Sequence, residues 1–536
     1  MNQEHPIHTS LNHLFHDTCL RFHQRIAYEH AGTTLSFEKL HDAATALATQ
    51  LIHLGLRPGM RVGVMLPNCL QHPIAIFGTM LAGGIVVNLN PLLTERELKN
   101  QLIDSGCQTI IILDYVAFKL EACLAETQLS HVIISQIGDC FPKHKALLAH
   151  MVLKYIKKLG PAHQLKDTHA FADLISHQQE HIKLPNVQDS NIAFLQYTGG
   201  TTGTPKAAIL THRNILYNIT QGTHAVKPEL FTEKSQSTIL LALPLYHIFA
   251  LTVSIISFSH GAKGLLVTNP KDTKKLLTII RSQPIHGMAL IQTLMNQLLI
   301  HEDFDKVDWS HLRQTINGGM KTHQMTARLW HQRTGCLVDE GYGLSETSPI
   351  IAISSHQHSF SETVGSPVLH TLVKVMKDPN TPAMKQEAGE IWVKGPQVMA
   401  GYWHQPEETH HAMTPDGWFK TGDIGLINPQ GEIKLIDREK DMIIVSGFNV
   451  YPQEVEEVIN SHPQVTECGV RSHGSKTAEI VAAYIVPGST ELTIAEILKH
   501  CRENLTAYKV PKKIIFVSTL PKSAVGKVLR RHLPAA

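Results

Sequence analysis

The sequence predicts an α/β protein with a large N-terminal body, built on largely parallel βα sheets, and a small, mobile α+β lid domain at the C-terminus. Helix and strand patterns alternate from residue 34 to about 115, which is typical of a parallel sheet covered by helices. From about residue 432 short strands alternate with capped helices instead. We therefore expect a body over 1–437, a lid over 438–536, and a hinge near the charged string DREKD at 437–441.

The first helices and strands of the body have clear sequence signals. Leucines at helical spacing between 40 and 54 predict a helix that ends at a glycine. RVGVML, 61–66, and TIIIL, 109–113, are apolar runs typical of buried strands. Between them a Thr-x-x-Glu capping box at Thr94 predicts a helix that ends near Gly106.

The lid combines four short strand patterns with two helix starts. Helices are expected to begin at Pro452 and at the capping box of Thr493 and Glu496. The strand patterns are EIKLID, MIIVS, EIVAAYIV and KIIFV. Two domains joined by one short hinge suggest a lid that moves during a reaction.

Composition excludes several classes of protein. The 536 residues carry 48 Lys plus Arg against 46 Asp plus Glu, so the net charge of +2 gives no reason to expect a nucleic-acid partner. Eight cysteines occur without any C-x-x-C pair, as expected for reduced thiols. The opening MNQEHPIHTS lacks the features of a secretory signal, and no run of about 18 residues is apolar enough to span a bilayer. We expect a cytoplasmic protein.

A loop rich in glycine and threonine, YTGGTTGTPK at 197–206, lies between two apolar strands. Its glycines let backbone N–H groups approach a ligand, its threonines add hydroxyl donors, and Lys206 adds a positive charge. Convergent N–H donors suit an anion, most plausibly a polyphosphate. The Walker A pattern is not met. On composition alone, a mobile surface loop remains the alternative.

Two further motifs are weak matches. HQQEH at 177–181 fits the H-x-x-E-H zinc pattern, but a rigid metal-binding helix is poorly supported beside Pro185, so we expect no zinc there. GLSET at 343–347 misses the G-x-S-x-G pattern of serine hydrolases because Thr347 replaces the last glycine.

Residues 143–160 form one amphipathic pattern with an apolar stripe and five lysines. A helix docked on its own domain is the first interpretation. Peripheral contact with the inner face of the membrane is the second, because basic amphipathic helices bind at lipid interfaces.

Four motifs in order and spacing resemble those of the adenylate-forming enzymes, which include acyl-CoA synthetases and firefly luciferase. YTGGTTGTPK resembles the family's phosphate loop, GYGLSET its adenine and metal segment, TGD with DREKD its ribose and hinge segment, and PKSAVGK its terminal catalytic lysine. LPLYHIFALT and VKGPQVMAGYW are particularly similar to bacterial long-chain fatty acid CoA ligases.

The resemblance implies two steps. A fatty acid carboxylate attacks the α-phosphorus of ATP and releases pyrophosphate, and the thiol of coenzyme A then displaces AMP from the acyl adenylate. The catalytic residues implied are Lys527, Lys206 and Glu346, with Glu346 also holding Mg²⁺. ATP and coenzyme A are co-substrates, and a homodimer remains open.

The other roles also follow from the resemblance. Adenine would stack on Tyr342, and Asp423 would bind the ribose hydroxyls with help from Arg438. His247 would stand at the mouth of the acyl channel, or be a core histidine. The remaining residues implied are Thr198, Gly199, Gly200, Thr201, Thr202, Gly203 and Thr204 for phosphate, Gly318, Gly319 and Gly343 for the nucleotide, Lys440 for the hinge and Gly447 for the coenzyme A channel.

Small departures from the family pattern leave alternatives open. Ala207 stands where a glycine commonly follows the loop lysine, Asn317 precedes Gly318 where another glycine is frequent, and the segment 471–479 lacks a usual Gly-Glu pair. None removes a catalytic group. The runner-up to a long-chain ligase is a medium-chain or aryl acid ligase, since sequence spacing does not report pocket depth. A non-catalytic acyl- or nucleotide-binding protein and a luciferase-like oxygenase are weaker alternatives.

Overall fold

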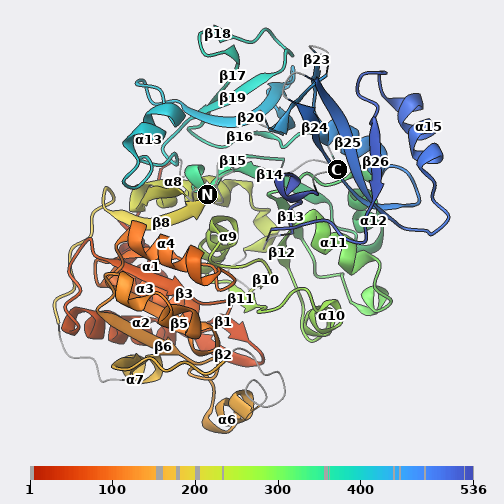
Figure 1. The fold of residues 1–536 in the computed structure, drawn as a ribbon. Helices are drawn as coiled ribbons and strands as arrows, with labels where there is room; N and C mark the ends of the chain where they lie inside the picture. Colours follow the sequence, from red (N-terminus) through yellow and green to blue (C-terminus); the bar gives the residue numbers. More distant parts are fainter. Residues whose placement is uncertain are drawn as a thin grey trace.

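Two large sheets and one smaller antiparallel sheet build the body, and a three-stranded and a two-stranded sheet build the C-terminal part (Figure 1). The computed structural model describes residues 5–151, 161–176, 182–198, 206–231, 235–354, 360, 362–438, 441–445, 448–475, 478–523 and 526–534. The predicted α/β class, with a large body and a smaller C-terminal unit, is confirmed.

The first sheet has seven strands, and the predicted strands at 61–66 and 109–113 lie inside it. Its order is β7 (Thr168–Ala170), β6 (His131–Ser135), β5 (Thr109–Leu113), β3 (Arg61–Met65), β4 (Ile85–Asn88), β8 (Ile192–Thr198) and β9 (Lys206–Thr211). All neighbours are parallel except β8 and β9, which pair antiparallel with Thr198 opposite Lys206. The glycine- and threonine-rich loop therefore connects the two strands of a hairpin at the sheet edge.

The second sheet has nine strands and a parallel centre. Its order is β16 (Ser366–Pro367), β15 (Ile350–Ile353), β14 (Val338–Gly343), β13 (Gln314–Gly318), β12 (Gly287–Leu290), β10 (Thr238–Leu241), β11 (Lys263–Leu266), β1 (Ile26–His30) and β2 (Thr33–Ser36). Every residue of the central strands β10 and β12 is buried, as expected where helices cover both faces.

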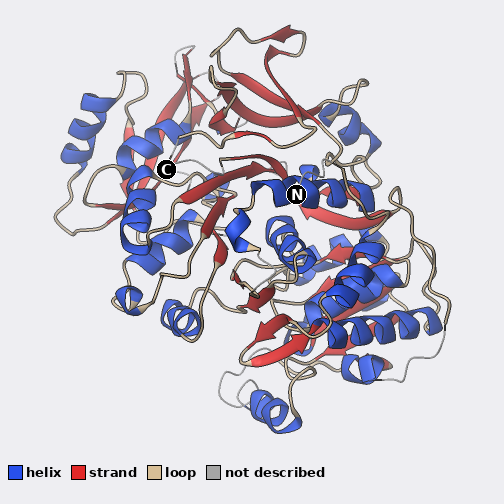
Figure 2. Ribbon diagram, turned by 180° about the vertical axis from the view of Figure 1, so that it is seen from behind, coloured by secondary structure: helices blue, strands red, loops and turns tan. Residues whose placement is uncertain are grey.

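Helices fill the space between these two sheets (Figure 2). Helix α3 (Gln71–Leu81) contacts β3 and β4, whereas α9 (Ile248–Ser259) contacts β10 and β11 of the other sheet. Helix α1 (Leu11–Arg21) touches both helices. Phe77 of α3 lies 4.3 Å from the ring of Phe15 and 5.1 Å from that of Phe258, centroid to centroid. Such buried aromatic pairs hold the two sheets together through one core.

The remaining helices of the body connect or flank the sheets. Their bounds are α2 (Phe37–His53), α4 (Glu95–Ser105), α5 (Phe118–Glu121), α6 (Lys143–Met151), α7 (Phe171–Ser176), α8 (His212–Ala225), α10 (Thr273–Arg281), α11 (Gln292–Leu299), α12 (Gln324–Thr334) and α13 (Pro406–Ala412). Both hydrogen bonds of the predicted capping box start α4, and Gly106, at φ 60°, ends it. Both local predictions are confirmed.

A five-stranded antiparallel sheet lies above the parallel sheets in Figure 1 and was not anticipated as a separate sheet. Its order is β18 (Thr381–Pro382), β17 (Leu372–Asp378), β19 (Gly389–Lys394), β20 (Phe419–Ile427) and β21 (Ile433–Arg438). Strand β17 is mostly exposed or half-buried, so its sequence carries little apolar alternation. This sheet brings TGD of β20 beside the end of β21.

The C-terminal unit has its own hydrophobic core. The body core extends to Ile433, and a separate core begins at Ile443 and includes Val455 of α14 and Ile497 of α15. The elements are β22 (Ile443–Val445), β23 (Phe448–Val450), α14 (Pro452–Asn460), β24 (Val465–Ser475), β25 (Ala478–Pro487), α15 (Ile494–Asn504) and β26 (Lys513–Phe516). Both predicted helix starts are confirmed. EIKLID, expected among the strands of the lid, is instead β21 of the body, because it pairs with β20 and buries Ile433 in the body core.

Candidate functional site

Asp423 is the centre of a buried polar cluster at the junction of three strands. Its carboxylate is in β20 opposite Arg438 of β21, and the Arg438 Nε lies 2.5 Å from Asp423 Oδ1. The Tyr342 hydroxyl, from β14, donates to Asp423 Oδ2 at 2.8 Å. Burial, followed by the nearby Asp423 charge, raises the pKa of Tyr342 well above its usual value, so the hydroxyl remains a donor. The structure thus brings together three residues predicted for adenine and ribose.

The end of β13 lies beside Tyr342 and carries two glycines, the first favoured by close packing and the second by its backbone conformation. Gly318 pairs with Gly341 of β14, and a Cβ at Gly318 would lie 2.9 Å from the ring of Phe249. Gly319 has φ +77°, a backbone conformation that suits glycine. A backbone without side chains can approach a flat ligand closely, which is the property expected of an adenine-lining segment.

Glu346 lies in the short turn after β14 and is 7 % exposed. The Tyr402 hydroxyl donates to Glu346 Oε1 at 2.9 Å. Burial raises the pKa of Glu346, and the hydrogen bond from Tyr402 partly offsets that change. Tyr402 lies outside the set predicted for the site, although it belongs to the VKGPQVMAGYW segment that resembles bacterial long-chain ligases.

Lys206, the first residue of β9, is close to the same tyrosine. Its ammonium lies 5.4 Å from the centre of the Tyr402 ring and forms an ion pair with Glu408 of α13. The hydrogen bond from Lys206 is the main reason why the pKa of Glu408 is lowered. Thr198 donates through Oγ1 to the Lys206 carbonyl at 3.4 Å. Glu408 was missed because sequence spacing gives no signal for a contact across two hundred residues.

A single buried carboxylate that shares Tyr402 as a neighbour with Lys206 fits Mg²⁺, which commonly takes one or two carboxylates and completes its shell with phosphate oxygens and water. Glu346 could hold the ion in this way. Within the described ranges, no cluster of three or more His, Cys, Asp or Glu side chains could hold a metal by itself. The residues therefore suit a metal that arrives with the nucleotide.

Lys527 lies in the C-terminal hairpin close to the same cluster. Its side chain retains contact with solvent, yet loss of solvation and the positive charge of Arg438 lower its pKa, and Asp423 partly offsets this. The hairpin rests on the body, because a Cβ at Gly526 would lie only 2.6 Å from Thr293 Oγ1. The structure therefore places Lys527, from the last residues of the chain, within electrostatic reach of Asp423.

The remaining predicted residues are His247, Gly343 and a set that lies outside the described residues. His247, just before α9, is half-buried, and burial lowers its pKa to about 4. Among the described residues we find no hydrogen-bond partner for its ring. Gly343 ends β14. The residues outside the described ranges are Gly199, Gly200, Thr201, Thr202, Gly203, Thr204, Lys440, Gly447, the HQQEH motif and positions 152–160 of the amphipathic segment 143–160.

Glu340 is a buried acidic residue that sequence reasoning missed. It precedes the predicted nucleotide segment on β14 and is 3 % exposed. Its Oε2 accepts from Asn317 Nδ2 at 3.2 Å and from the Thr322 N–H at 3.4 Å, so it closes the loop that carries Gly318 and Gly319. Burial raises its pKa to about 7, with hydrogen bonds from Thr322 and Asn317 opposing the shift.

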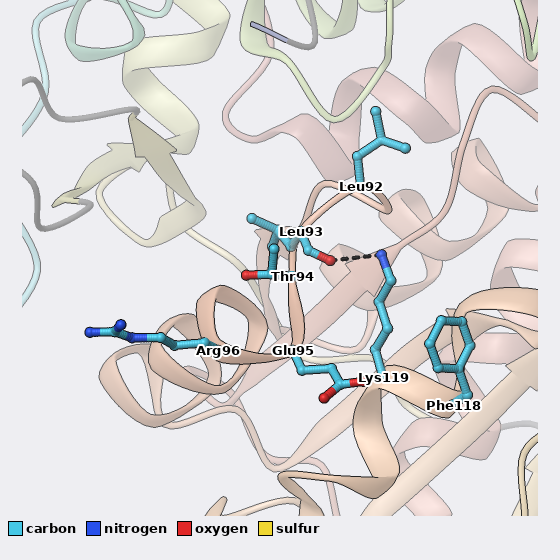
Figure 3. A pocket seen from close by; sticks show the side chains of 7 residues that line it. All are labelled: Leu92, Leu93, Thr94, Glu95, Arg96, Phe118 and Lys119. Atoms are coloured by element: carbon cyan, nitrogen blue, oxygen red, sulfur yellow. Dashed lines mark hydrogen bonds between the residues drawn. The ribbon is translucent and has the colours of Figure 1, made fainter. Parts of the chain in front are cut away.

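A surface hollow of about 480 Å³ at the start of α4 is not part of this cluster (Figure 3). Its lining residues are Leu92, Leu93, Thr94, Glu95, Arg96, Phe118 and Lys119. The Lys119 ammonium donates to the carbonyls of Pro91 and Leu93 at 2.8 and 2.7 Å, so it fastens the loop before α4. None of the predicted site residues lines the hollow, and we assign it no catalytic role.

Comparison with known proteins agrees with the motif assignment. The AMP-binding enzyme family model matches residues 15–403, and the AMP-binding enzyme C-terminal domain matches 454–527. A long-chain-fatty-acid–CoA ligase of Yersinia pestis is 42% identical over 98% of this chain and 94% of its own length. One from Bacillus subtilis is 35% identical over the same shares.

A solved structure has the same fold over almost the whole chain. ATP-bound MatB from Rhodopseudomonas palustris superposes with a TM-score of 0.84 at 26% identity, and the match covers 97% of each chain. The fold match and both family models therefore cover the body and the C-terminal unit. This chain belongs to the AMP-binding enzyme family, the adenylate-forming enzymes that the four motifs predicted.

Proposed function

We propose that this protein is an ATP-dependent long-chain fatty acid CoA ligase. The observation that carries the proposal is the near full-length identity of 42% to a long-chain-fatty-acid–CoA ligase, together with the cluster of Asp423, Tyr342 and Arg438 that Lys527 approaches. Body residues 1–437 would form the nucleotide and acyl pockets. Residues 438–536 would form a lid hinged near 437–441.

The residues of the chain would divide the chemistry as follows. Asp423 and Arg438 would hold the ribose, and the backbone at Gly318 and Gly319 would line the adenine with Tyr342. When bound, Mg²⁺ at Glu346 would neutralise phosphate charge.

Positive charge at the reacting centre would come from two lysines. Lys206 would bind the leaving phosphates together with the loop 199–205. Lys527 would neutralise charge between the fatty acid carboxylate and the α-phosphate as the acyl adenylate forms. Coenzyme A would then enter past Gly447 after rotation about Lys440, and the fatty acid would pass His247.

The test is pyrophosphate release by purified protein with ATP, Mg²⁺ and a chain-length series of fatty acids, each with and without coenzyme A. Turnover that favours long chains and requires coenzyme A supports the proposal. Lys527→Ala should abolish this turnover. Lys522→Ala removes another lysine of the same hairpin, one that pairs with Glu467, and should leave the turnover unchanged. A preference for medium-chain or aryl acids would replace the substrate assignment. ATP binding without turnover of any acid would indicate a binding protein.

We further propose that helix α6 contacts an anionic membrane surface. Leu147 is 63% exposed and Met151 is 42% exposed, with Lys143 on the same helix. Lys145 instead donates to the Ala31 carbonyl at 2.5 Å, which fastens the helix to the body. None of the described helices is long and apolar enough to cross a membrane, so the contact would be peripheral.

The membrane proposal is tested by replacing basic residues while Lys145, which fastens α6 to the body, is retained. Replacing Lys143, Lys154, Lys157 and Lys158 by glutamate, with Lys145 retained, should reduce co-sedimentation with anionic vesicles and leave binding to neutral vesicles unchanged. Unchanged co-sedimentation with anionic vesicles would mean that α6 is only a packing element.

A further inference from the structure

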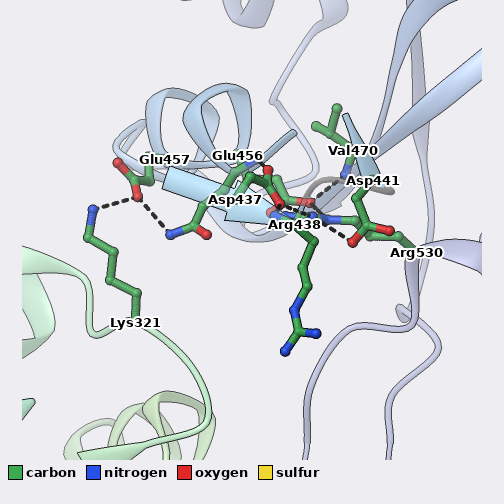
Figure 4. A network of polar contacts seen from close by, with 9 residues as sticks. Lys321, Asp437, Arg438, Asp441, Glu456, Glu457, Val470 and Arg530 are labelled. Carbon is green, nitrogen blue, oxygen red and sulfur yellow. Dashed lines mark hydrogen bonds and ion pairs between the residues drawn. The ribbon is translucent and has the colours of Figure 1, made fainter. Parts of the chain in front are cut away.

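Arg530 lies three residues after Lys527, and its guanidinium is bound by three carboxylates (Figure 4). Nε and Nη2 donate to the two oxygens of Glu456 at 2.9 and 2.6 Å. Nη1 donates to Asp437 at 2.7 Å and to Asp441 at 3.1 Å. The arginine side chain is 17% exposed, so the chain encloses one cation with three anions.

The three carboxylates come from both sides of the predicted hinge. Asp437 is in β21, opposite Ile424 of β20, so it belongs to the antiparallel sheet of the body. Asp441 is the last residue of the hinge string, and Glu456 is on α14 of the C-terminal unit. Arg530 therefore joins the end of the chain to a strand of the body across the hinge.

Asp437 is held firmly enough to act as the fixed end of this connection. Its side chain is 2% exposed, and besides Arg530 it accepts from the backbone N–H groups of Arg438 and Gln453 at 2.7 and 2.5 Å. Arg438 extends from the same strand toward Asp423. The strand that orients the predicted ribose site thus also orients Arg530.

Two other contacts place the C-terminal unit on the body. Lys321, beside the Gly318–Gly319 segment, lies 2.7 Å from Glu457 of α14. Gly526 packs against Thr293. Arg530 differs from both because it lies in the same tail as Lys527 and contributes a planar, bidentate fork, which fixes direction as well as distance.

We propose that Arg530 is the positioning residue for Lys527: by bridging Glu456 and Asp437 it fixes the C-terminal tail so that the Lys527 ammonium faces Asp423 and Arg438 during adenylate formation. This inference rests on the proposed function. Coenzyme A transfer would start from an adenylate already formed, so it would depend much less on this placement.

The test separates the two half-reactions. Arg530→Lys retains the charge but loses the fork, and Asp437→Asn weakens the connection of Arg530 to the body while Glu456 and Asp441 remain its partners. For both variants, ATP–pyrophosphate exchange with a long-chain fatty acid should fall about tenfold or more. Transfer to coenzyme A from chemically synthesised acyl adenylate should stay within about twofold of wild type. Arg502→Lys, at an exposed position of α15, is the matched control and should change neither rate.

Tryptic cleavage in the hinge string DREKD gives a readout that does not depend on activity. Cleavage should be faster in both variants, because Arg530 no longer connects the two sides of the hinge firmly. Equal losses in both half-reactions, or exchange and cleavage rates like those of wild type, would overturn the proposal. It would equally fail if Lys527→Ala retained full exchange, because Arg530 would then have nothing to position. Failure of the proposed function is distinct, since wild type itself would then show no exchange.

Discussion

Replacing Glu340 by glutamine should stabilise the protein above neutral pH. Glu340 is almost fully buried on β14, and Asn317 and Thr322 both donate to it. Two nearby acceptor atoms, Asn317 Oδ1 and Thr322 Oγ1, are themselves buried without a hydrogen-bond partner in the described structure. A protonated Glu340 could donate to one of them, and so could the amide of glutamine.

The size of the effect follows from the pKa of Glu340. Burial raises it from 4.5 to about 7, so the folded protein binds more protons than the unfolded chain between these pH values. Stability contributed by the neutral carboxyl is complete below pH 4.5 and is lost as the pH rises to about 7. At about 1.4 kcal/mol per pKa unit the loss is roughly 3 kcal/mol, which Glu340→Gln avoids.

The assay compares thermal unfolding of wild type and Glu340→Gln from pH 5 to pH 8.5, without nucleotide. The advantage of the variant should grow up to about pH 7 and then level off. Glu407→Gln, at an exposed position of α13, should show no such trend. A difference that is constant with pH, or a variant less stable than wild type at pH 8.5, would refute the reasoning.

Two further predictions concern the same site. Glu408→Gln should lower KM for ATP about two- to fivefold at low salt, because Lys206 loses a competing anion, and the advantage should disappear at high salt; a higher KM would contradict this. Gly343→Ala should destabilise the protein by about 3 kcal/mol or more, because its Cβ would lie 1.8 Å from the Pro349 carbonyl oxygen. Gly341→Ala is the control and should cost less, because its Cβ would lie 3.3 Å from the nearest atom. Equal melting temperatures of the two variants would contradict this prediction.

Local signals in the sequence were sufficient for many elements of the fold. Capping boxes at Thr94 and Thr493 start helices as expected, and apolar runs such as 109–113 form buried strands. Of the antiparallel sheet β17–β21, only β21 was expected as a strand, from EIKLID. The half-exposed strand β17 gave no comparable signal, because it is stabilised by pairing with another strand of the sheet. Periodicity of apolar residues in the sequence reports which face of a strand is buried, and strands β17 and β18 bury few of their residues.

The site shows the same limit. Motif resemblance pointed to Tyr342, Asp423 and Arg438, and the structure brings these three into contact. The resemblance gave no indication of Glu408 or of Glu340, because their importance depends on burial and on partners elsewhere in the chain. Such residues are visible only when the fold fixes their surroundings, since a glutamate in a sequence is usually a surface residue.

The electrostatics of Lys527 suggest why its domain should respond to the nucleotide. Partial loss of solvation and the positive charge of Arg438 lower the pKa of Lys527, although its side chain is exposed and Asp423 partly offsets the change, so without further anions its charge is incompletely compensated. Under the proposed function, ATP would bring several negative charges to this point. A ligand that binds more tightly when the C-terminal unit is in one orientation shifts the protein toward that orientation, by a free energy equal to the difference between its two binding free energies. Nucleotide binding would therefore strengthen docking of the C-terminal unit, with Arg530 ensuring that the docked unit presents its lysine in one direction.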